Sequence, residues 1–199
     1  SLSSEIILFA PSVNDIYEGK ILSQSFDFDG LENQMEGKFR PGHFNGVGTI
    51  VKCLFEIVSP TNAYFGEKDF QQLQIVKKMV EKNHLQVKVI GCEIYREKNG
   101  LAMSSRNERL TEIEKNQAAL IYKTLQAAKN KFKKNSAKEV SDWVKKAFDK
   151  NETFALEYFQ IADESMLLPC IRKNKNKNYR AFIAVVVNNI RLIDTISLN

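Results

Sequence analysis

Histidine and cysteine are scarce in this chain of 199 residues, which has only two histidines and three cysteines. The cysteines are far apart and odd in number, and no Cys-x-x-Cys pair occurs. This pattern argues for a reducing compartment and against both a disulfide framework and a thiolate zinc site. Two histidines cannot build a histidine-rich metal centre, so we assign no metal ligands. The sequence also shows no basic-then-apolar leader, and the cytoplasm is the expected location.

Long apolar runs are absent as well. None reaches the 18 or so residues that a membrane span needs, and we expect no membrane partner. The net charge of +5 is mild. Much of the basic excess lies in residues 129–134 and 172–180, and Tyr179 is the only aromatic residue of the second stretch. A groove for single-stranded nucleic acid would need interleaved aromatic side chains, so we expect no nucleic-acid partner.

The first half of the chain alternates candidate strands and helices. Residues 5–10 form a continuous apolar run, typical of a buried strand, and suggest that the chain begins inside a fold. Apolar periodicity predicts helices over 45–58 and 69–83, with short strands over 63–65 and 87–91. This alternation is typical of right-handed βαβ units on a parallel sheet.

A different pattern begins after about residue 92. Two capping boxes, Thr111-x-x-Glu114 and Ser136-x-x-Glu139, predict two helices. Residues 156–162 form a candidate strand, and 181–187 with 190–196 form a candidate hairpin. We therefore predict an α/β chain with two domains. Residues 1–91 contain the parallel sheet, and residues 92–199 form a small α+β domain with an antiparallel sheet.

The segment Gly66-Glu67-Lys68-Asp69-Phe70-Gln71-Gln72 lies between a predicted strand and a predicted helix. Unpaired backbone N–H groups and the helix dipole favour an anion there, and Lys68 adds a positive charge. Asp69 could cap the helix, and Gln72 could reach a ligand one turn later. A phosphate site and an ordinary capped helix with surface side chains are both open.

A second candidate site is Met103-Ser104-Ser105-Arg106, which follows Gly100. Two hydroxyl groups and a guanidinium on a glycine-started loop suit a phosphate group. A simple loop before a helix is the alternative. A third motif contains Arg40, Gly42, His43 and Gly46 in a turn before the first helix, where a structural role is the alternative to ligand contact.

Together the three motifs resemble those of the pantoate–β-alanine ligases (pantothenate synthetases). The pattern is Glu-Gly-x-x-Arg-Pro-Gly-His-Phe-x-Gly-Val, then Phe-Gly-Glu-Lys-Asp-x-Gln-Gln, then Gly-Leu-Ala-Met-Ser-Ser-Arg-Asn. Residues 9–13 and 191–194 also match. The resemblance covers nearly the whole chain, but the family's initial segment, with its His-x-Gly-His signature, has no counterpart here.

The resemblance implies a Rossmann-like sheet and an enzyme that uses ATP and Mg²⁺. Pantoate would be activated as pantoyl adenylate with release of pyrophosphate, and β-alanine would then displace AMP to give pantothenate. It also implies a homodimer. Without the initial segment we expect this chain to be inactive alone. The alternative is a non-catalytic folded module that retains nucleotide-binding turns.

The resemblance also assigns roles to individual residues. Lys68 and Arg106 are the candidate catalytic residues. Contacts to ATP are assigned to Gly66, Glu67, Lys68, Asp69, Tyr95, Met103, Ser104, Ser105 and Arg106. Contacts to pantoate are assigned to Gln72 and to an apolar wall of Val47, Ile50 and Val51. Arg40 and His43 belong to the family motif, but no role is assigned to them.

Overall fold

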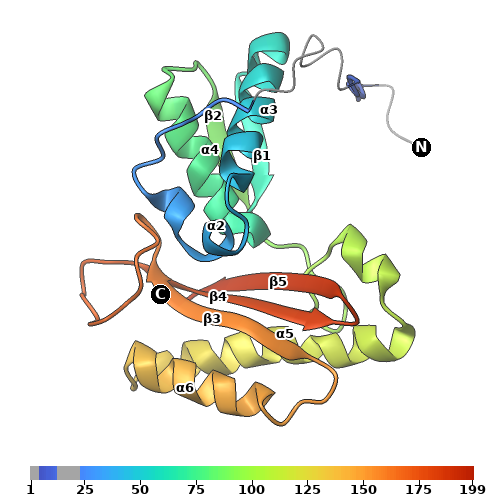
Figure 1. Ribbon diagram of the computed structural model, residues 1–199, viewed down its shortest axis with the longest axis vertical. Helices are drawn as coiled ribbons and strands as arrows, with labels where there is room; N and C mark the ends of the chain where they lie inside the picture. Colours follow the sequence, from blue (N-terminus) through green and yellow to red (C-terminus); the bar gives the residue numbers. More distant parts are fainter. Residues whose placement is uncertain (1–4, 13–22) are drawn as a thin grey trace.

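The computed structural model describes residues 5–12 and 23–199 and shows two lobes stacked on each other (Figure 1). The first lobe contains a short parallel sheet with helices around it. Its elements are the 3₁₀ turn η1 (Leu31–Asn33), α2 (Met35–Phe39), α3 (His43–Val58), β1 (Asn62–Gly66), the 3₁₀ turn η2 (Glu67–Asp69), α4 (Phe70–Lys82) and β2 (Lys88–Cys92).

Strands β1 and β2 are parallel, and α4 is the connection between them. Helix α4 forms because apolar side chains recur at helical spacing, and this stripe is buried in the core of the lobe. The helices predicted over 45–58 and 69–83 are confirmed, and so is the parallel pairing. The short helix α2 was not predicted, because its five residues are too few to show a period.

The second lobe is a three-stranded antiparallel sheet covered on one face by two helices (Figure 1). Its elements are the 3₁₀ turn η3 (Ser105–Arg109), α5 (Glu112–Phe132), α6 (Ala137–Phe148), β3 (Ala155–Asp163), β4 (Tyr179–Val187) and β5 (Ile190–Ser197). Both capping boxes are present. Asn188 and Asn189 have φ values of 45° and 61°, as a two-residue hairpin turn requires. The predicted α/β fold class is therefore confirmed.

The strand expected over residues 5–10 is wrong. This segment has no strand structure, and Ile7 and Leu8 are 91% and 78% exposed. An apolar run becomes a buried strand only where neighbouring strands pair with it, and none pairs with it in residues 5–12 and 23–199. Position 13 of the family motif lies outside the described residues. The domain boundary near residue 91 stays a prediction.

The first lobe packs on the face of the antiparallel sheet opposite α5 and α6 (Figure 1). Phe182 of β4 belongs to the apolar core that α4 contributes to, and its ring lies 6.1 Å from that of Phe70. The ring of Phe39, at the end of α2, stacks on Tyr158 of β3 at 5.4 Å. These contacts place α2 and the start of α4 directly over the sheet. Within residues 5–12 and 23–199, none of the helices has the length and hydrophobicity of a membrane-spanning segment.

Candidate functional site

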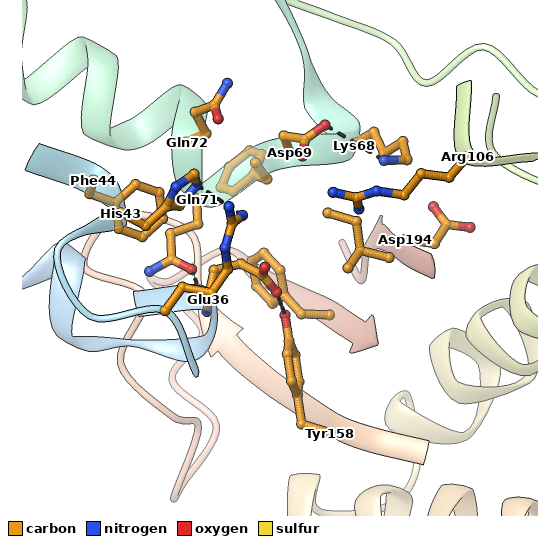
Figure 2. Close-up of a pocket in the computed structure, with 14 residues that line it drawn as sticks. Glu36, His43, Phe44, Lys68, Asp69, Gln71, Gln72, Arg106, Tyr158 and Asp194 are labelled. Atoms are coloured by element: carbon orange, nitrogen blue, oxygen red, sulfur yellow. Dashed lines mark hydrogen bonds and ion pairs between the residues drawn. The ribbon is translucent and has the colours of Figure 1, made fainter. Parts of the chain in front are cut away.

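A cavity of about 260 Å³ lies where the two lobes meet (Figure 2). The turn after β1 and the start of α4 form one side, and α2 with the start of α3 forms another. Strands β3, β4 and β5 contribute the floor. The lining residues are Glu36, Arg40, His43, Phe44, Lys68, Asp69, Phe70, Gln71, Gln72, Arg106, Tyr158, Phe182, Ile193 and Asp194. The structure therefore brings together four predicted site residues, which are Lys68, Asp69, Gln72 and Arg106.

Lys68 and Arg106 make one end of the cavity cationic. Lys68 lies in η2, and its only carboxylate neighbour within ion-pair distance in the described chain is Asp69, at 3.7 Å. Arg106 is exposed, and its Nη1 donates a hydrogen bond to the backbone carbonyl of Arg191 at 3.3 Å. The Ser104 hydroxyl accepts from the Arg106 backbone N–H at 3.3 Å and so caps η3. Two cations from different lobes therefore converge on one end of the cavity.

Asp69 precedes α4 but does not cap it through its side chain, which corrects the expected capping role. The side chain is half exposed and faces Lys68 instead. The first backbone N–H groups of α4 are therefore left without a side-chain cap, beside the cationic end of the cavity. Uncapped N–H groups at a helix start favour an anion. This local arrangement supports the phosphate-site interpretation over that of a capped helix.

Arg40 and His43 line the cavity from the turn between α2 and α3. Gly42 allows this turn, because its φ of 78° is disfavoured for residues with a side chain. Arg40 Nη1 donates to His43 Nε2 at 3.1 Å, so the ring proton is on Nδ1. Burial, and then the Arg40 charge, lower the pKa of His43. The imidazole is consequently neutral at neutral pH, and Arg40 has no carboxylate within ion-pair distance in the described chain.

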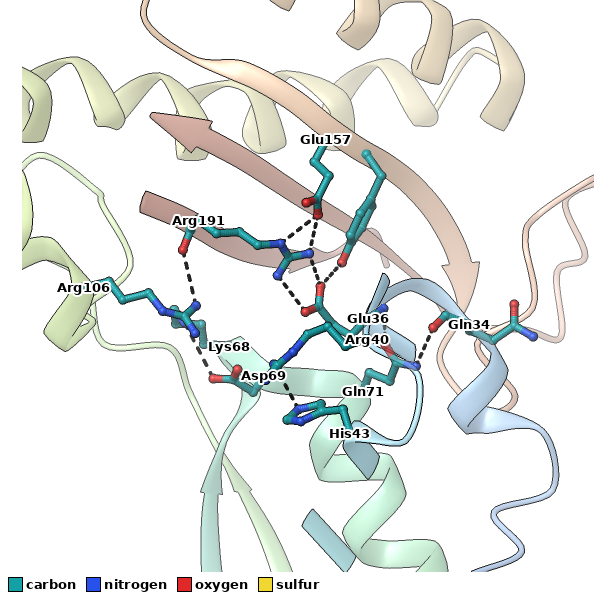
Figure 3. Close-up of polar contacts among 11 residues, drawn as sticks. Gln34, Glu36, Arg40, His43, Lys68, Asp69, Gln71, Arg106, Glu157 and Arg191 are labelled. Atoms are coloured by element: carbon teal, nitrogen blue, oxygen red, sulfur yellow. Dashed lines mark hydrogen bonds and ion pairs between the residues drawn. The ribbon is translucent and has the colours of Figure 1, made fainter. Parts of the chain in front are cut away.

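Glu36 anchors this turn to the sheet (Figure 3). Its carboxylate accepts two hydrogen bonds from Arg191, at 2.7 and 2.8 Å, and one from the Tyr158 hydroxyl at 2.7 Å. Burial by itself raises the pKa of Glu36, but the hydrogen bonds from Arg191 and Tyr158 outweigh burial and leave this pKa below its ordinary value. Glu36 is therefore a largely buried, ionised carboxylate that connects α2 with β3 and β5.

Gln71 and Gln72 are neighbours on α4 with different surroundings. Gln71 is buried, and its Nε2 donates to the backbone carbonyls of Leu31 and Gln34 at 2.8 and 2.9 Å. Its Oε1 accepts from the Glu36 N–H at 3.0 Å. These bonds fix the segment before α2 against α4. Gln72 also lines the cavity, and its side-chain amide makes no hydrogen bond within the described part of the chain, so it is available to a ligand.

An ion pair between the partly buried Arg96 and the buried Asp194 lies beside the Lys68 end of the cavity, which Asp194 lines. Arg96 donates two hydrogen bonds to Asp194, at 2.7 and 3.0 Å, and its guanidinium lies 3.7 Å from the Tyr122 ring centroid. Burial raises the pKa of Asp194, while the Arg96 bonds and the Lys68 charge oppose this shift. We assign Asp194 the ionised state, because two short guanidinium bonds satisfy the carboxylate. It thus adds a negative charge near Lys68.

Several predicted nucleotide contacts lie outside the cavity. Glu67 is paired with Arg180 at 3.1 Å, so its carboxylate is already occupied. The Tyr95 carbonyl accepts from the Met103 N–H at 2.9 Å. Gly66 and Ser105 are exposed. Contacts of these residues with ATP remain predictions.

The predicted apolar wall is on α3, where Val47, Ile50 and Val51 are partly exposed. Val47 and Val51 pack against the core of the first lobe, and none of the three lines the cavity. Sequence reasoning missed Gln71, Tyr158 and Asp194. Gln71 could have been found, because it lies in the first turn of a helix that follows a candidate phosphate loop.

No group of three or more possible metal ligands occurs in residues 5–12 and 23–199. This does not conflict with Mg²⁺, which is commonly held by substrate phosphates and one or two carboxylates. Among the cavity carboxylates, Glu36 and Asp194 are engaged by arginines. Asp69, with its loose contact to Lys68, is the carboxylate that remains for such an ion.

Comparison with known proteins agrees with this geometry. Residues 2–197 match the family model of pantoate-beta-alanine ligase. The chain is 66% identical to the pantothenate synthetase of Flavobacterium psychrophilum over 197 residues, which is 99% of this chain and 70% of that protein. It is 54% identical to that of Christiangramia forsetii, again over 70% of the relative.

Solved structures show the same fold. The pantothenate synthetase of Thermus thermophilus superposes with a TM-score of 0.85 at 35% identity, over 96% of this chain and 68% of that one. The pantoate-beta-alanine ligase of Francisella tularensis, solved with β,γ-ATP and β-alanine, gives a TM-score of 0.67 at 30% identity, over 93% and 62% of the two chains. The chain therefore belongs to the pantoate–β-alanine ligase family of enzymes.

Proposed function

We propose that the cavity between the lobes binds the reacting groups of an ATP-dependent ligation of pantoate with β-alanine. The observation that carries this proposal is the convergence of Lys68 and Arg106, from different lobes, beside the uncapped start of α4. Positive side chains and the N–H groups of a helix start without a side-chain cap stabilise phosphate oxygens when they lie in one place. The complex of the Francisella tularensis relative with β,γ-ATP and β-alanine supports the same assignment.

The proposed reaction has two steps. A carboxylate oxygen of pantoate attacks the α-phosphorus of ATP, and the bond to the bridging oxygen breaks to release pyrophosphate. The β-alanine amine then attacks the acyl carbon of pantoyl adenylate, forming the amide and releasing AMP. Lys68 and Arg106 stabilise the negative charge that develops on the phosphate oxygens in both steps. Mg²⁺, held by the phosphates and Asp69, would add a further positive charge.

The other end of the cavity suits a carboxylate. Arg40 is a guanidinium without a carboxylate partner in the described chain, and the neutral His43 lies 3.1 Å from it. We assign this pair to the carboxylate of β-alanine, and Gln72 to the hydroxyl groups of pantoate. Catalysis is then mainly the positioning of two acids and a nucleotide.

This chain spans 70% of the length of its Flavobacterium psychrophilum relative, and its two histidines supply no His-x-Gly-His motif. We therefore propose that these 199 residues do not turn over substrate alone. The homodimer stays a prediction of the family resemblance, and the cytoplasmic location stays a prediction from the sequence.

A hybrid enzyme tests the function. The matching region of the Flavobacterium psychrophilum pantothenate synthetase is replaced by this chain, and AMP release from ATP, pantoate and β-alanine is measured. The expected result is AMP release that depends on both acids, while this chain by itself releases none. A hybrid that melts cooperatively but releases no AMP would contradict the proposal. AMP release by the 199-residue chain, at a single intact mass, would contradict its inactivity.

A further inference from the structure

Arg191 of β5 is bonded to Glu36, next to the Arg40 end of the cavity, and to Arg106 at the other end, without lining the cavity itself (Figure 3). Its side chain forms a bidentate pair with Glu36, and its Nε donates to Glu157 at 2.8 Å. Its backbone carbonyl accepts the hydrogen bond from Arg106 Nη1 at 3.3 Å. One residue of the sheet is thus bonded to α2 on one side and to the η3 loop on the other.

The connection to Arg40 passes through the backbone of α2. Glu36 is in the first turn of this helix, and its carbonyl accepts the Arg40 N–H at 2.9 Å. The Arg40 carbonyl in turn accepts the His43 N–H at 3.1 Å. A five-residue helix has little stability of its own, so its position depends on tertiary contacts. The Glu36 carboxylate, held by Arg191 and Tyr158, supplies such a contact at the side of α2 that faces the sheet.

We propose that Arg191 is a positioning residue that sets the distance between the Arg40 end and the Arg106 end of the cavity. Its guanidinium holds the turn that carries Arg40, and its carbonyl holds the guanidinium of Arg106. This inference deepens the proposed function and rests on it, because the two ends are assigned to a carboxylate and to phosphate. The spacing between these ends determines which pair of anions fits.

Arg180 of the neighbouring strand β4 is a matched control. It is also an arginine that joins the lobes, with bonds to Glu164 at 2.9 Å and to Glu67 at 3.1 Å. It contacts the turn before α4, however, and has no bond to α2 or η3 within the described residues. In Arg191→Lys and Arg180→Lys, the guanidinium is replaced by an ammonium group, which is a point charge and cannot make the forked contacts to two carboxylates. The two substitutions thus remove similar interactions at different places.

The first experiment needs no ligand. The Nε–Hε signals of Arg40 and Arg106 in this chain are recorded by NMR and assigned with the Arg40→Lys and Arg106→Lys variants. We expect Arg191→Lys to shift the Arg40 signal, because lysine loses the fork to Glu36, and Arg180→Lys to leave this signal unchanged. Lysine at position 191 keeps the backbone carbonyl that accepts from Arg106, so the Arg106 signal is expected to change less than the Arg40 signal. Glu36→Gln, which keeps the size of the side chain, is expected to shift Arg40 alone. An unchanged Arg40 signal in a folded Arg191→Lys variant would overturn the inference.

The second experiment uses the hybrid enzyme. Arg191→Lys is expected to raise the KM for β-alanine at least fivefold, whereas Arg180→Lys raises the KM for ATP only. A merely structural role would lower the amount of active enzyme, and thus kcat, without changing either KM. Equal effects of the two variants on the KM for β-alanine would contradict the inference. If the wild-type hybrid is inactive, the proposed function fails, and the NMR signals alone decide the role of Arg191.

Discussion

The guanidinium of Arg180 lies 3.1 Å from the carboxylate of Glu67, although 113 residues separate them. The guanidinium also lies 4.0 Å from the Phe70 ring centroid and 2.9 Å from Glu164. A buried arginine of the second lobe thereby holds the turn between β1 and α4, which carries Lys68. Glu67 consequently fixes the position of this turn through its bond to Arg180.

This relationship predicts a difference in stability between two variants. Arg180→Met leaves the carboxylates of Glu67 and Glu164 without their cation, and we expect a loss of about 3 kcal/mol in the free energy of unfolding. Glu67→Gln keeps a polar group beside Arg180 and is expected to cost about 1 kcal/mol. Urea denaturation of both variants measures the difference. An Arg180→Met variant as stable as the wild type would show that the pair does not connect the lobes.

The buried pair of Arg96 and Asp194 gives a second prediction. Arg96→Met removes two guanidinium bonds and leaves the Asp194 carboxylate buried without a cation, at an expected cost of about 3–5 kcal/mol. Arg172→Met is the control, because Arg172 is exposed, and such a change alters stability by about 0.5 kcal/mol or less. Thermal unfolding of both variants checks this, and equal melting temperatures would contradict it.

How much could be predicted from the sequence differs between the two lobes. The hairpin turn at Asn188 and Asn189, and the capping boxes of α5 and α6, depend on neighbouring residues and were predicted correctly. The apolar run at residues 5–10 was misassigned, because strand formation depends on partner strands that local sequence does not specify.

The site residues also differ in whether neighbouring residues or distant parts of the chain determine their positions. Lys68 and Arg106 were predicted from local motifs and the family resemblance, and the structure places both at the cavity. Tyr158, Asp194 and Arg191 come from the antiparallel sheet, and only the packing of the lobes brings them to the site. Arg191 and Asp194 matched the family pattern, but their bonds to Glu36 and Arg96 could not be derived from spacing along the chain.

The pKa of His43 provides a test of the Arg40 end. We expect NMR titration to give a pKa below the ordinary value of about 6.5, because burial and the Arg40 charge both disfavour the imidazolium. Because the pKa of His43 is lower in the folded state than in the unfolded state, its neutral form stabilises the fold at pH values above the unfolded pKa. This contribution is lost as the pH falls from about 6.5 through the folded value.

A bound carboxylate at Arg40 should reverse part of this shift. β-Alanine added to the hybrid enzyme is expected to raise the pKa of His43, because a negative charge beside the ring favours its protonated form. Ethylamine, which has the amine but no carboxylate, is the control and should leave the pKa unchanged. The same pKa with and without β-alanine, at a concentration that saturates the enzyme, would place the carboxylate elsewhere.

The forked geometry of Arg106 predicts that lysine cannot replace it. Arg106→Lys in the hybrid enzyme keeps the charge but cannot make the proposed bidentate contact to phosphate, and we expect about a tenfold loss in kcat/KM for ATP. Arg109→Lys, in the same 3₁₀ turn and also exposed, is expected to match the wild type. Steady-state kinetics with ATP as the varied substrate measure both values. Equal losses in the two variants would mean that Arg106 has no specific contact with the nucleotide.

The most direct measurement is the rate of AMP formation in a single turnover by the hybrid enzyme with Lys68→Met. Methionine keeps the length of the side chain and removes its charge, and Lys134→Met is the control at an exposed lysine. Loss of one group that stabilises transition-state charge typically costs about 100- to 1,000-fold in rate. The proposal that Lys68 stabilises phosphate charge predicts a loss of that size for Lys68→Met and wild-type rates for Lys134→Met. A Lys68→Met enzyme within twofold of the wild type would contradict it.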